Sequence, residues 1–185
     1  MRVLLDACVL YPTVMREVLL GVAGAGLFTP LWSARILEEW ARAAARLHSD
    51  QDCGQEHIAR GEIALLKARW PKSAVEYSAD LEASLYLPDE NDKHVLAAAM
   101  TGKADILLTQ NLKDFPTRTL TSHGVIRQGP DGFLCELYQE NQQLVGQVAE
   151  DVRQVAEQLS GQPQDMRKLM KKARLPRFGK ALAAV

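Results

Sequence analysis

Several features that mark exported or membrane-bound proteins are scarce in this sequence. It has three cysteines, Cys8, Cys53 and Cys135, an odd and widely spaced set that argues against a disulfide framework and for a reducing compartment. No apolar run approaches the length of a membrane span. The opening segment MRVLLDACVL meets an acid within its first residues and lacks the apolar core of a signal peptide. We therefore expect a cytoplasmic protein without membrane contact.

Charge of one sign and zinc-binding patterns are also lacking. The formal net charge is −1, so nothing in the overall charge attracts nucleic acid and any basic surface must be local. The cysteines and the four histidines show no paired zinc spacing, which disfavours a zinc site. With 47% hydrophobic and 24% charged residues over 185 positions, the chain suits one α/β domain with a modest appendage.

Short apolar runs alternate with amphipathic segments in the first two thirds of the chain. Ser33 is expected to cap a helix, and a polar turn is expected at 48–54. This alternation predicts a three-layer α/β/α domain with a central, mainly parallel sheet. The expected strands are 2–5, 27–32 and 105–109, and the expected helices are 11–22, 34–44, 56–70 and 93–101.

The later part of the chain predicts a different organisation. A short edge strand is expected at 119–121, a last strand at 125–126, and a long helix from Phe133 to about Leu159. The tail beyond it interleaves apolar residues with Lys and Arg, which more often indicates a solvated helix face than a nucleic-acid contact. We predict an α/β domain over 1–135 and a helical C-terminal extension over 136–185.

Acidic residues follow the expected strands and precede one expected helix. Asp6 ends the first strand, and Asp114 follows the third. Between them lies an acidic turn of Asp89, Glu90 and Asp92; capping the next helix accounts for Asp92 alone. Parallel strands leave a sheet at the same edge, so carboxylates far apart in sequence are expected to converge there.

Converging carboxylates predict a hard cation. A like-charge pair at about 4 Å costs about 4 kcal/mol at an effective dielectric near 20, and oxygen-rich acidic sites suit Mg²⁺ or Mn²⁺. Such an ion lowers the pKa of a bound water and neutralises charge on a phosphodiester. Thr109 and Asn111 are expected to orient these groups by hydrogen bonds. His94 either contacts substrate phosphate or lies on the helix surface.

Four segments together resemble a PIN domain, the nuclease fold of many toxin–antitoxin (VapC-like) ribonucleases. They are LLDACVLYP, WSARILEEW, PDENDKHVLAAA and LLTQNLKDF, and the resemblance covers residues 2 to about 135. It implies that Asp6, Glu39, Asp92 and Asp114 hold Mg²⁺ or Mn²⁺. Glu39 is preferred to the adjacent Glu38 because it lies six residues after Ser33 and just before Trp40, as in the family; at ~100° per residue only one of the two can face the site.

The sequence departs from the family pattern at two places near the site. Asn111 stands where some relatives have an acid, and Asp89 is an additional acid whose role is open. The length beyond residue 135 is similar to that of a longer PIN subgroup. The resemblance implies a metal-dependent endoribonuclease, the toxin of a toxin–antitoxin pair, with RNA as substrate, an antitoxin protein as partner and a homodimer as an expected assembly.

Two other readings are open at this point. A catalytically degenerate PIN-like module could use the basic tail at 167–180 to hold RNA or an acidic partner. A phosphatase with an Asp6 nucleophile would need a second acid at position 8 to protonate the leaving group, and that position is Cys8. The presence of all four carried-over acids favours the nuclease.

Overall fold

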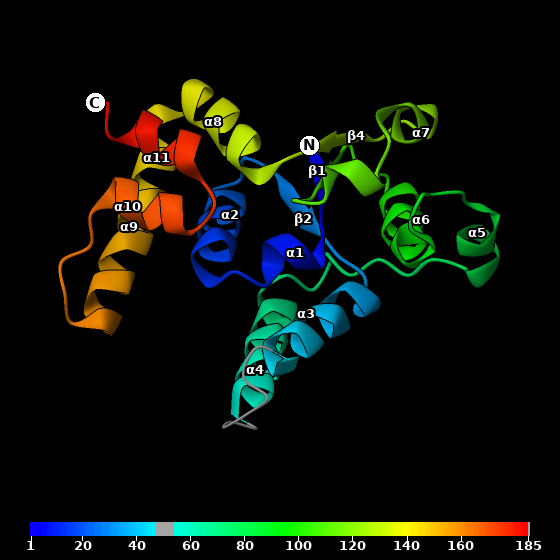
Figure 1. The fold of residues 1–185 in the computed structure, drawn as a ribbon, viewed down its shortest axis with the longest axis horizontal. Helices are drawn as coiled ribbons and strands as arrows, with labels where there is room; N and C mark the ends of the chain where they lie inside the picture. The colour runs from blue at the N-terminus through cyan, green and yellow to red at the C-terminus, as the bar shows by residue number, and fades with distance from the viewer. Residues whose placement is uncertain (47–53, 185) are drawn as a thin grey trace. The chain divides into compact units, whose positions relative to one another are not determined.

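A computed structural model describes residues 1–46 and 54–184 (Figure 1). The predicted turn at 48–54 lies outside these residues, apart from Gly54. The strands are β1 (Arg2–Leu5), β2 (Thr29–Leu31), β3 (Ile106–Leu108) and β4 (Ile126–Gln128). The helices are α1 (Ala7–Leu10), α2 (Thr13–Gly24), α3 (Ala34–Arg46), α4 (Gly54–Arg69), α5 (Ala79–Ser84), η1 (Glu90–Asp92), α6 (Lys93–Thr101), η2 (Leu112–Asp114), α7 (Thr117–Ser122), α8 (Pro130–Glu140), α9 (Gln142–Ser160), α10 (Met166–Lys172) and α11 (Pro176–Leu182).

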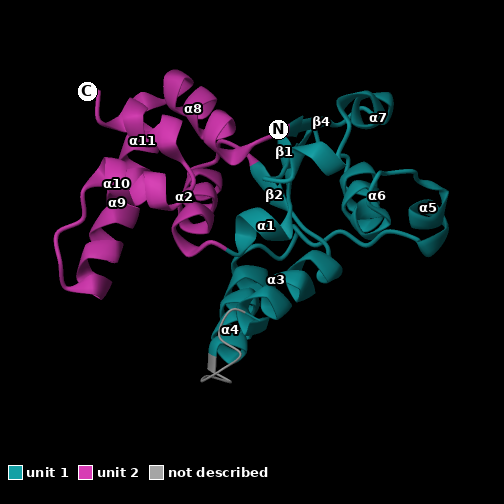
Figure 2. Ribbon diagram, in the orientation of Figure 1, with its two compact units in different colours: residues 1–11, 29–127 teal, residues 12–28, 128–185 magenta. Residues whose placement is uncertain are grey.

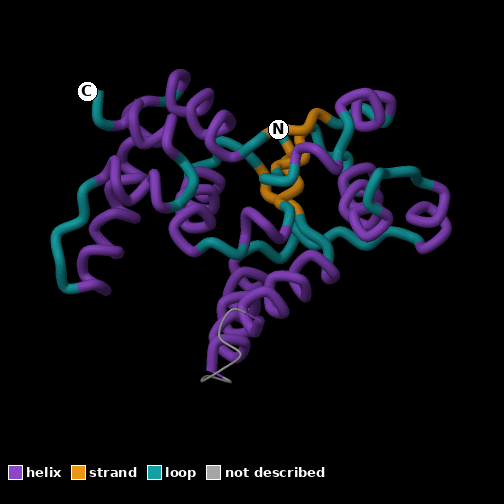
Figure 3. Tube along the Cα trace, in the orientation of Figure 1, coloured by secondary structure: helices purple, strands orange, loops and turns teal. Residues whose placement is uncertain are grey.

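The four strands form one sheet in the order β2-β1-β3-β4, drawn in orange in Figure 3. β1 pairs in parallel with both neighbours, and Leu5 stands opposite Leu108 in the register. Val3, Leu4 and Leu5 are fully buried, as expected of a central parallel strand that is covered on both faces. The predicted α/β fold with a mainly parallel sheet is therefore confirmed.

Most of the expected helices form where the apolar spacing places them. α3 buries Ile36, Leu37 and Trp40 on one face and packs against α4. Its first turn is capped as predicted, because the backbone N–H of Ile36 donates to Ser33 Oγ at 3.2 Å. None of the described helices is long and apolar enough to cross a membrane.

The edge strand expected at 119–121 is wrong, because this segment is helix α7. Thr119 and Thr121 suggested extended structure, but two hydroxyls of this segment find acceptors within the helix. Thr121 Oγ1 donates to the carbonyl of Thr117 at 2.8 Å, and Ser122 Oγ donates to the carbonyl of Thr119 at 2.7 Å. Burial of Leu120, which is fully inaccessible, then anchors the short helix.

The single long helix expected from Phe133 to Leu159 is also wrong. It divides into α8 and α9 at Asn141, whose φ of −137° and ψ of 55° are not helical. The change of direction lets α8 pack against α9, which one continuous helix could not do. Tertiary packing thus overrides a helical spacing that continues on both sides of the break.

The chain forms two compact units, shown in teal and magenta in Figure 2. The first comprises 1–11 and 29–127 and contains the sheet. The second comprises 12–28 and 128–185, so helix α2 belongs with the C-terminal helices and contacts α9. Compactness differs from independent folding, so the domain boundary expected between residues 135 and 136 stays a prediction.

Aromatic pairs and small residues build the interior of the second unit. Phe28 and Phe133 meet edge to face with ring centroids 5.3 Å apart, and Tyr138 and Phe178 do so at 6.0 Å. Gly179 lets α11 approach α10 closely, because a Cβ there would lie 2.7 Å from Met170 Cβ.

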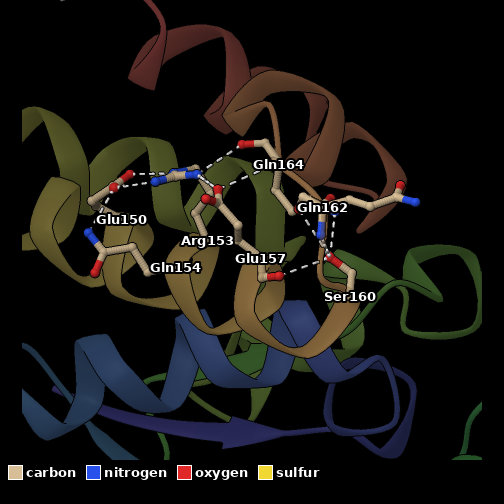
Figure 4. A network of polar contacts seen from close by, with 7 residues as sticks. All are labelled: Glu150, Arg153, Gln154, Glu157, Ser160, Gln162 and Gln164. Atoms are coloured by element: carbon tan, nitrogen blue, oxygen red, sulfur yellow. Dashed lines mark hydrogen bonds and ion pairs between the residues drawn. The ribbon is translucent and has the colours of Figure 1, made fainter.

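A polar network holds the connection between α9 and α10 (Figure 4). Arg153 donates to Glu150 Oε1 at 2.7 Å, to Glu157 and to the carbonyl of Gln164. Ser160 Oγ accepts from Gln164 Nε2 at 2.9 Å. Glu157 accepts from the Gln164 N–H at 3.3 Å, which ties the segment after α9 back to the helix. Arg153 lowers the pKa of Glu150 to about 2.

Gly179→Ala is expected to lower the free energy of unfolding by roughly 1–3 kcal/mol, the usual cost of overpacking. The clash would be with a Cβ atom and with the backbone carbonyl of Arg167 at 3.3 Å, neither of which can rotate away. Gly61→Ala is the matched control, since a Cβ at Gly61 meets nothing within 4 Å and should stabilise α4 by up to about 1 kcal/mol. Urea unfolding measures both. Equal effects of the two substitutions would contradict the close α10–α11 contact.

Candidate functional site

The site begins where β1 and β3 end side by side. The register that pairs Leu5 with Leu108 places Asp6 next to Thr109, and the Asp6 N–H continues the ladder to the carbonyl of Leu108 at 3.1 Å. Thr109 Oγ1, fully buried, donates to Asp6 Oδ2 at 2.7 Å. The parallel sheet therefore holds an acid in a fixed orientation at its carboxyl edge.

Cys8 completes the surroundings of Asp6. Its Sγ donates to Asp6 Oδ2 at 3.0 Å and accepts from the Gln110 N–H at 3.2 Å. Burial, followed by the negative charge of Asp6, raises the pKa of the Cys8 thiol to about 12. Position 8 thus carries a neutral hydrogen-bond donor to Asp6 and not the acid that phosphatase chemistry would require.

Three acids from the expected cluster lie together. Asp89, Asp92 and Asp114 each offer a carboxylate oxygen within 4.8 Å of the other two. Asp92 ends the η1 turn, and Asp114 ends η2 beyond β3. Asp89, whose role the sequence left open, is therefore part of the group, whereas Asp6 and Glu39 lie outside it.

Asp92 is the most perturbed acid of the site. It was expected to cap the next helix, but its side chain makes no capping hydrogen bond; Asp89 instead accepts from the Asn91 N–H at 2.9 Å. Burial raises the pKa of Asp92 to about 6, with further contributions from the charges of Asp6, Asp89 and Asp114. Its buried Oδ2 finds no hydrogen-bond partner among residues 1–46 and 54–184.

The loop after β3 is tied down so that Asp114 keeps its place. Asn111 Nδ2 donates to Asp114 Oδ2, and the Asn111 N–H donates to Thr109 Oγ1 at 3.0 Å. From the other side, Arg127 donates to the carbonyls of Leu112 and Phe115, which flank Asp114. Arg127 lies in β4 and was not singled out from the sequence.

Glu38 and Glu39 are adjacent on α3 and contact different partners. Glu38 pairs with Arg42 at 3.1 Å and Arg60 at 3.0 Å, and these hydrogen bonds hold its pKa below the usual range. Glu39 Oε1 instead lies 2.9 Å from Nε2 of His94, on the helix that begins after Asp92. His94 is 1% exposed, so neither of its two expected roles, substrate contact or helix surface, is correct.

An open pocket of about 1050 Å³ lies beside Glu38 and Glu39 of α3. Its lining includes Cys8, Glu39 and Asn91 together with Arg35 and Arg42 of α3. Carboxylates therefore border a solvent-accessible space in which cations also line the wall. Asp89, Asp92 and Asp114 are not among the described residues that line it, so this pocket is bordered mainly by α3.

The donor set fits a hard divalent ion. Three carboxylates within bridging distance repel one another, and the raised pKa of Asp92 records that repulsion together with burial. An unpartnered, buried carboxylate oxygen costs free energy unless a donor or cation meets it. Oxygen-only ligands of this kind suit Mg²⁺ or Mn²⁺.

Comparison with known proteins finds similar sequences for part of the chain. The PIN domain family matches residues 2–113. A protein of Mycobacterium tuberculosis named putative ribonuclease VapC50 is 42% identical over 52 residues, which make up 26% of this chain and 31% of that protein. The chain therefore matches about a third of that relative's length. No solved structure matches significantly.

Proposed function

Since this chain belongs to the PIN-domain family, we propose that it is a Mg²⁺- or Mn²⁺-dependent endoribonuclease. The observation that carries the proposal is the group of Asp89, Asp92 and Asp114, within which a buried oxygen of Asp92 has no protein partner in the described part of the chain. The substrate class comes from the matching relative, whose name calls it a putative ribonuclease.

Asp92 and Asp114 would hold the ion, with Asp6 and Glu39 completing the set and Asp89 supporting it. A divalent ion bound there would supply a water of lowered pKa and neutralise charge that grows on the phosphoryl oxygens. The chain need not provide a nucleophile of its own. This agrees with the neutral thiol of Cys8, which donates to Asp6.

The remaining polar residues act as positioning residues. Thr109 and Cys8 both donate to Oδ2 of Asp6, and Asn111 donates to Oδ2 of Asp114. His94 holds one oxygen of Glu39. Hydrogen bonds of this kind fix the direction of a carboxylate and so reduce the reorganisation needed on binding.

The biological setting is part of the same proposal. As a toxin of a toxin–antitoxin pair, the chain would act on RNA in the cytoplasm and be inhibited by an antitoxin protein, with a homodimer as the expected assembly. Its expression without the antitoxin would slow growth, and Asp6→Asn would relieve that effect. These expectations come from the family and not from any contact in the structure.

Cleavage of a labelled single-stranded RNA by the full chain tests the activity. After removal of divalent ions with EDTA we expect no cleavage, and addition of Mg²⁺ or Mn²⁺ should restore it, because the carboxylate group alone offers no general mechanism for hydrolysis. Cleavage that persists in EDTA would overturn the metal mechanism. Metal-independent retention of RNA without cleavage would instead support the degenerate binding module.

A further inference from the structure

The second unit carries seven exposed cations on its last two helices and the turn between them. They are Arg167, Lys168, Lys171, Lys172, Arg174, Arg177 and Lys180, and we call them the basic surface. No acid occurs between residues 166 and 185. Without these seven, the chain has 15 Lys and Arg against 23 Asp and Glu, so the rest of the molecule is strongly negative.

The cations are segregated from the apolar residues on each helix. At ~100° per residue, the four cations of α10 fall within an arc of about 140°, and the buried Leu169 and Met170 lie outside it. On α11, Arg177 and Lys180 fall within about 60°, on the side away from Phe178 and Gly179. Each helix therefore presents one charged face and one buried face.

Close packing fixes the two helices against each other. The site of a Cβ on Gly179 lies 3.6 Å from the Arg167 Cα, so Arg167 on α10 stands beside the residue that precedes Lys180 on α11. Asp131 fixes the start of α11 by accepting from the N–H groups of Arg177 and Phe178 at 3.1 and 2.9 Å. The cations thus sit on a fixed framework.

The apolar side of both helices is already used. Leu175 and Phe178 are fully buried, as is Met170, so the tail packs its apolar side into the interior. What remains exposed is charge with little apolar area. Protein interfaces need an apolar or aromatic core with few charges, whereas a polyanion needs spaced cations.

We propose that the basic surface binds the phosphate backbone of single-stranded RNA. The proposal rests on the proposed function in taking RNA as the substrate class, and it assigns part of the RNA affinity to the second unit. Lys and Arg that neutralise phosphates release condensed counterions, which gives affinity without base readout. Such attraction offsets the repulsion between RNA and the otherwise negative chain.

The test measures RNA binding by the full-length Asp92→Asn chain, so that cleavage does not intervene. The probe is a fluorescent oligouridylate of about 20 nucleotides, longer than a typical single-strand site. The test variant carries Lys168→Gln, Lys171→Gln and Lys172→Gln. The matched control carries Lys67→Gln, Lys72→Gln and Lys103→Gln, which are exposed lysines of the first unit, so both variants have the same net charge.

Loss of three phosphate contacts should reduce the slope of log affinity against log salt by about 2, since each contact contributes about 0.7. Raising the salt from about 50 to 200 mM weakens RNA binding by both proteins. The factor by which affinity falls should be about 20 times smaller for the test variant than for its parent. The control should keep the parent's slope. Circular dichroism of both variants should match the parent, because all six lysines are exposed.

Equal slopes for test variant and parent would overturn the proposal, and so would equal effects of the two triple variants. Retention of polyglutamate as tightly as oligouridylate would also overturn it, since that would indicate an acidic polypeptide as the ligand. The two proposals fail separately. RNA binding without metal-dependent cleavage by the wild-type chain would overturn the nuclease alone, and cleavage with an unchanged slope would overturn the basic surface alone.

Discussion

Asp92→Asn is expected to lower metal-dependent RNA cleavage about 1000-fold or more, equivalent to ~4 kcal/mol of transition-state stabilisation. Asp92 belongs to the group with Asp89 and Asp114 and keeps a buried oxygen free of protein partners among the described residues. The amide would keep the shape of the side chain while removing the charge that a divalent ion needs. Loss of activity would then report on binding of the ion and not on unfolding.

The same substitution should stabilise the metal-free protein. Burial and three neighbouring acids raise the pKa of Asp92 from 3.8 to about 6, so the folded state binds this proton more tightly than the unfolded chain. Stability therefore falls as the pH rises from about 4 to 6, and the cost persists above that range. The full shift corresponds to at most about 3 kcal/mol, which solvent screening reduces to roughly 1–2 kcal/mol.

Thermal unfolding with EDTA and with Mg²⁺ separates these effects. In EDTA above pH 7, Asp92→Asn should melt at a higher temperature than the wild type; Mg²⁺ should raise the wild-type melting temperature and leave that of the variant nearly unchanged. Asp105→Asn is the control, because Asp105 is exposed just before β3, where it accepts from the Arg2 N–H. A variant at position 92 that cleaves RNA like the wild type would contradict the proposed site.

The adjacent acids of α3 provide a matched pair for the second prediction. Glu39→Gln should lower cleavage about 10- to 100-fold, the usual range for a residue that orients or completes a metal site. Its carboxylate lies 2.9 Å from Nε2 of the buried His94, on the helix that follows Asp92. Glu38→Gln should leave cleavage unchanged, because among the described residues Glu38 pairs with Arg42 and Arg60 and not with His94.

Cleavage measured against Mn²⁺ concentration distinguishes a role at the ion from a general loss of structure. Glu39→Gln should shift the half-maximal concentration upward, while saturating Mn²⁺ should recover part of the rate. Glu38→Gln should follow the wild-type curve. Equal curves for both variants, or a larger effect at position 38, would show that the family-based choice of Glu39 is wrong.

Local patterns in the sequence were sufficient for the framework of the site. The apolar runs Val3–Leu5 and Ile106–Leu108 predicted buried strands, and alternation with helices predicted that their carboxyl ends meet. Ser33 predicted its helix start. These predictions succeeded because each depends on neighbouring residues alone, through burial of a periodic face or a cap one turn away.

Tertiary packing decided the features that the spacing of residues did not indicate. Asp89 joins Asp92 and Asp114 because the η1 turn and the loop held by Arg127 meet in space. The segment around Leu120 is a helix because burial of that side chain outweighs the extended preference of its threonines.

The sequence alone therefore determined the fold class and the residue types of an acidic, oxygen-rich site, since both follow from patterns within single segments. Only the tertiary structure decided which carboxylates are neighbours and that α2 belongs to the second unit. The reason is physical: repulsion between charges and burial of side chains depend on distances between segments, which the order of residues along the chain does not specify.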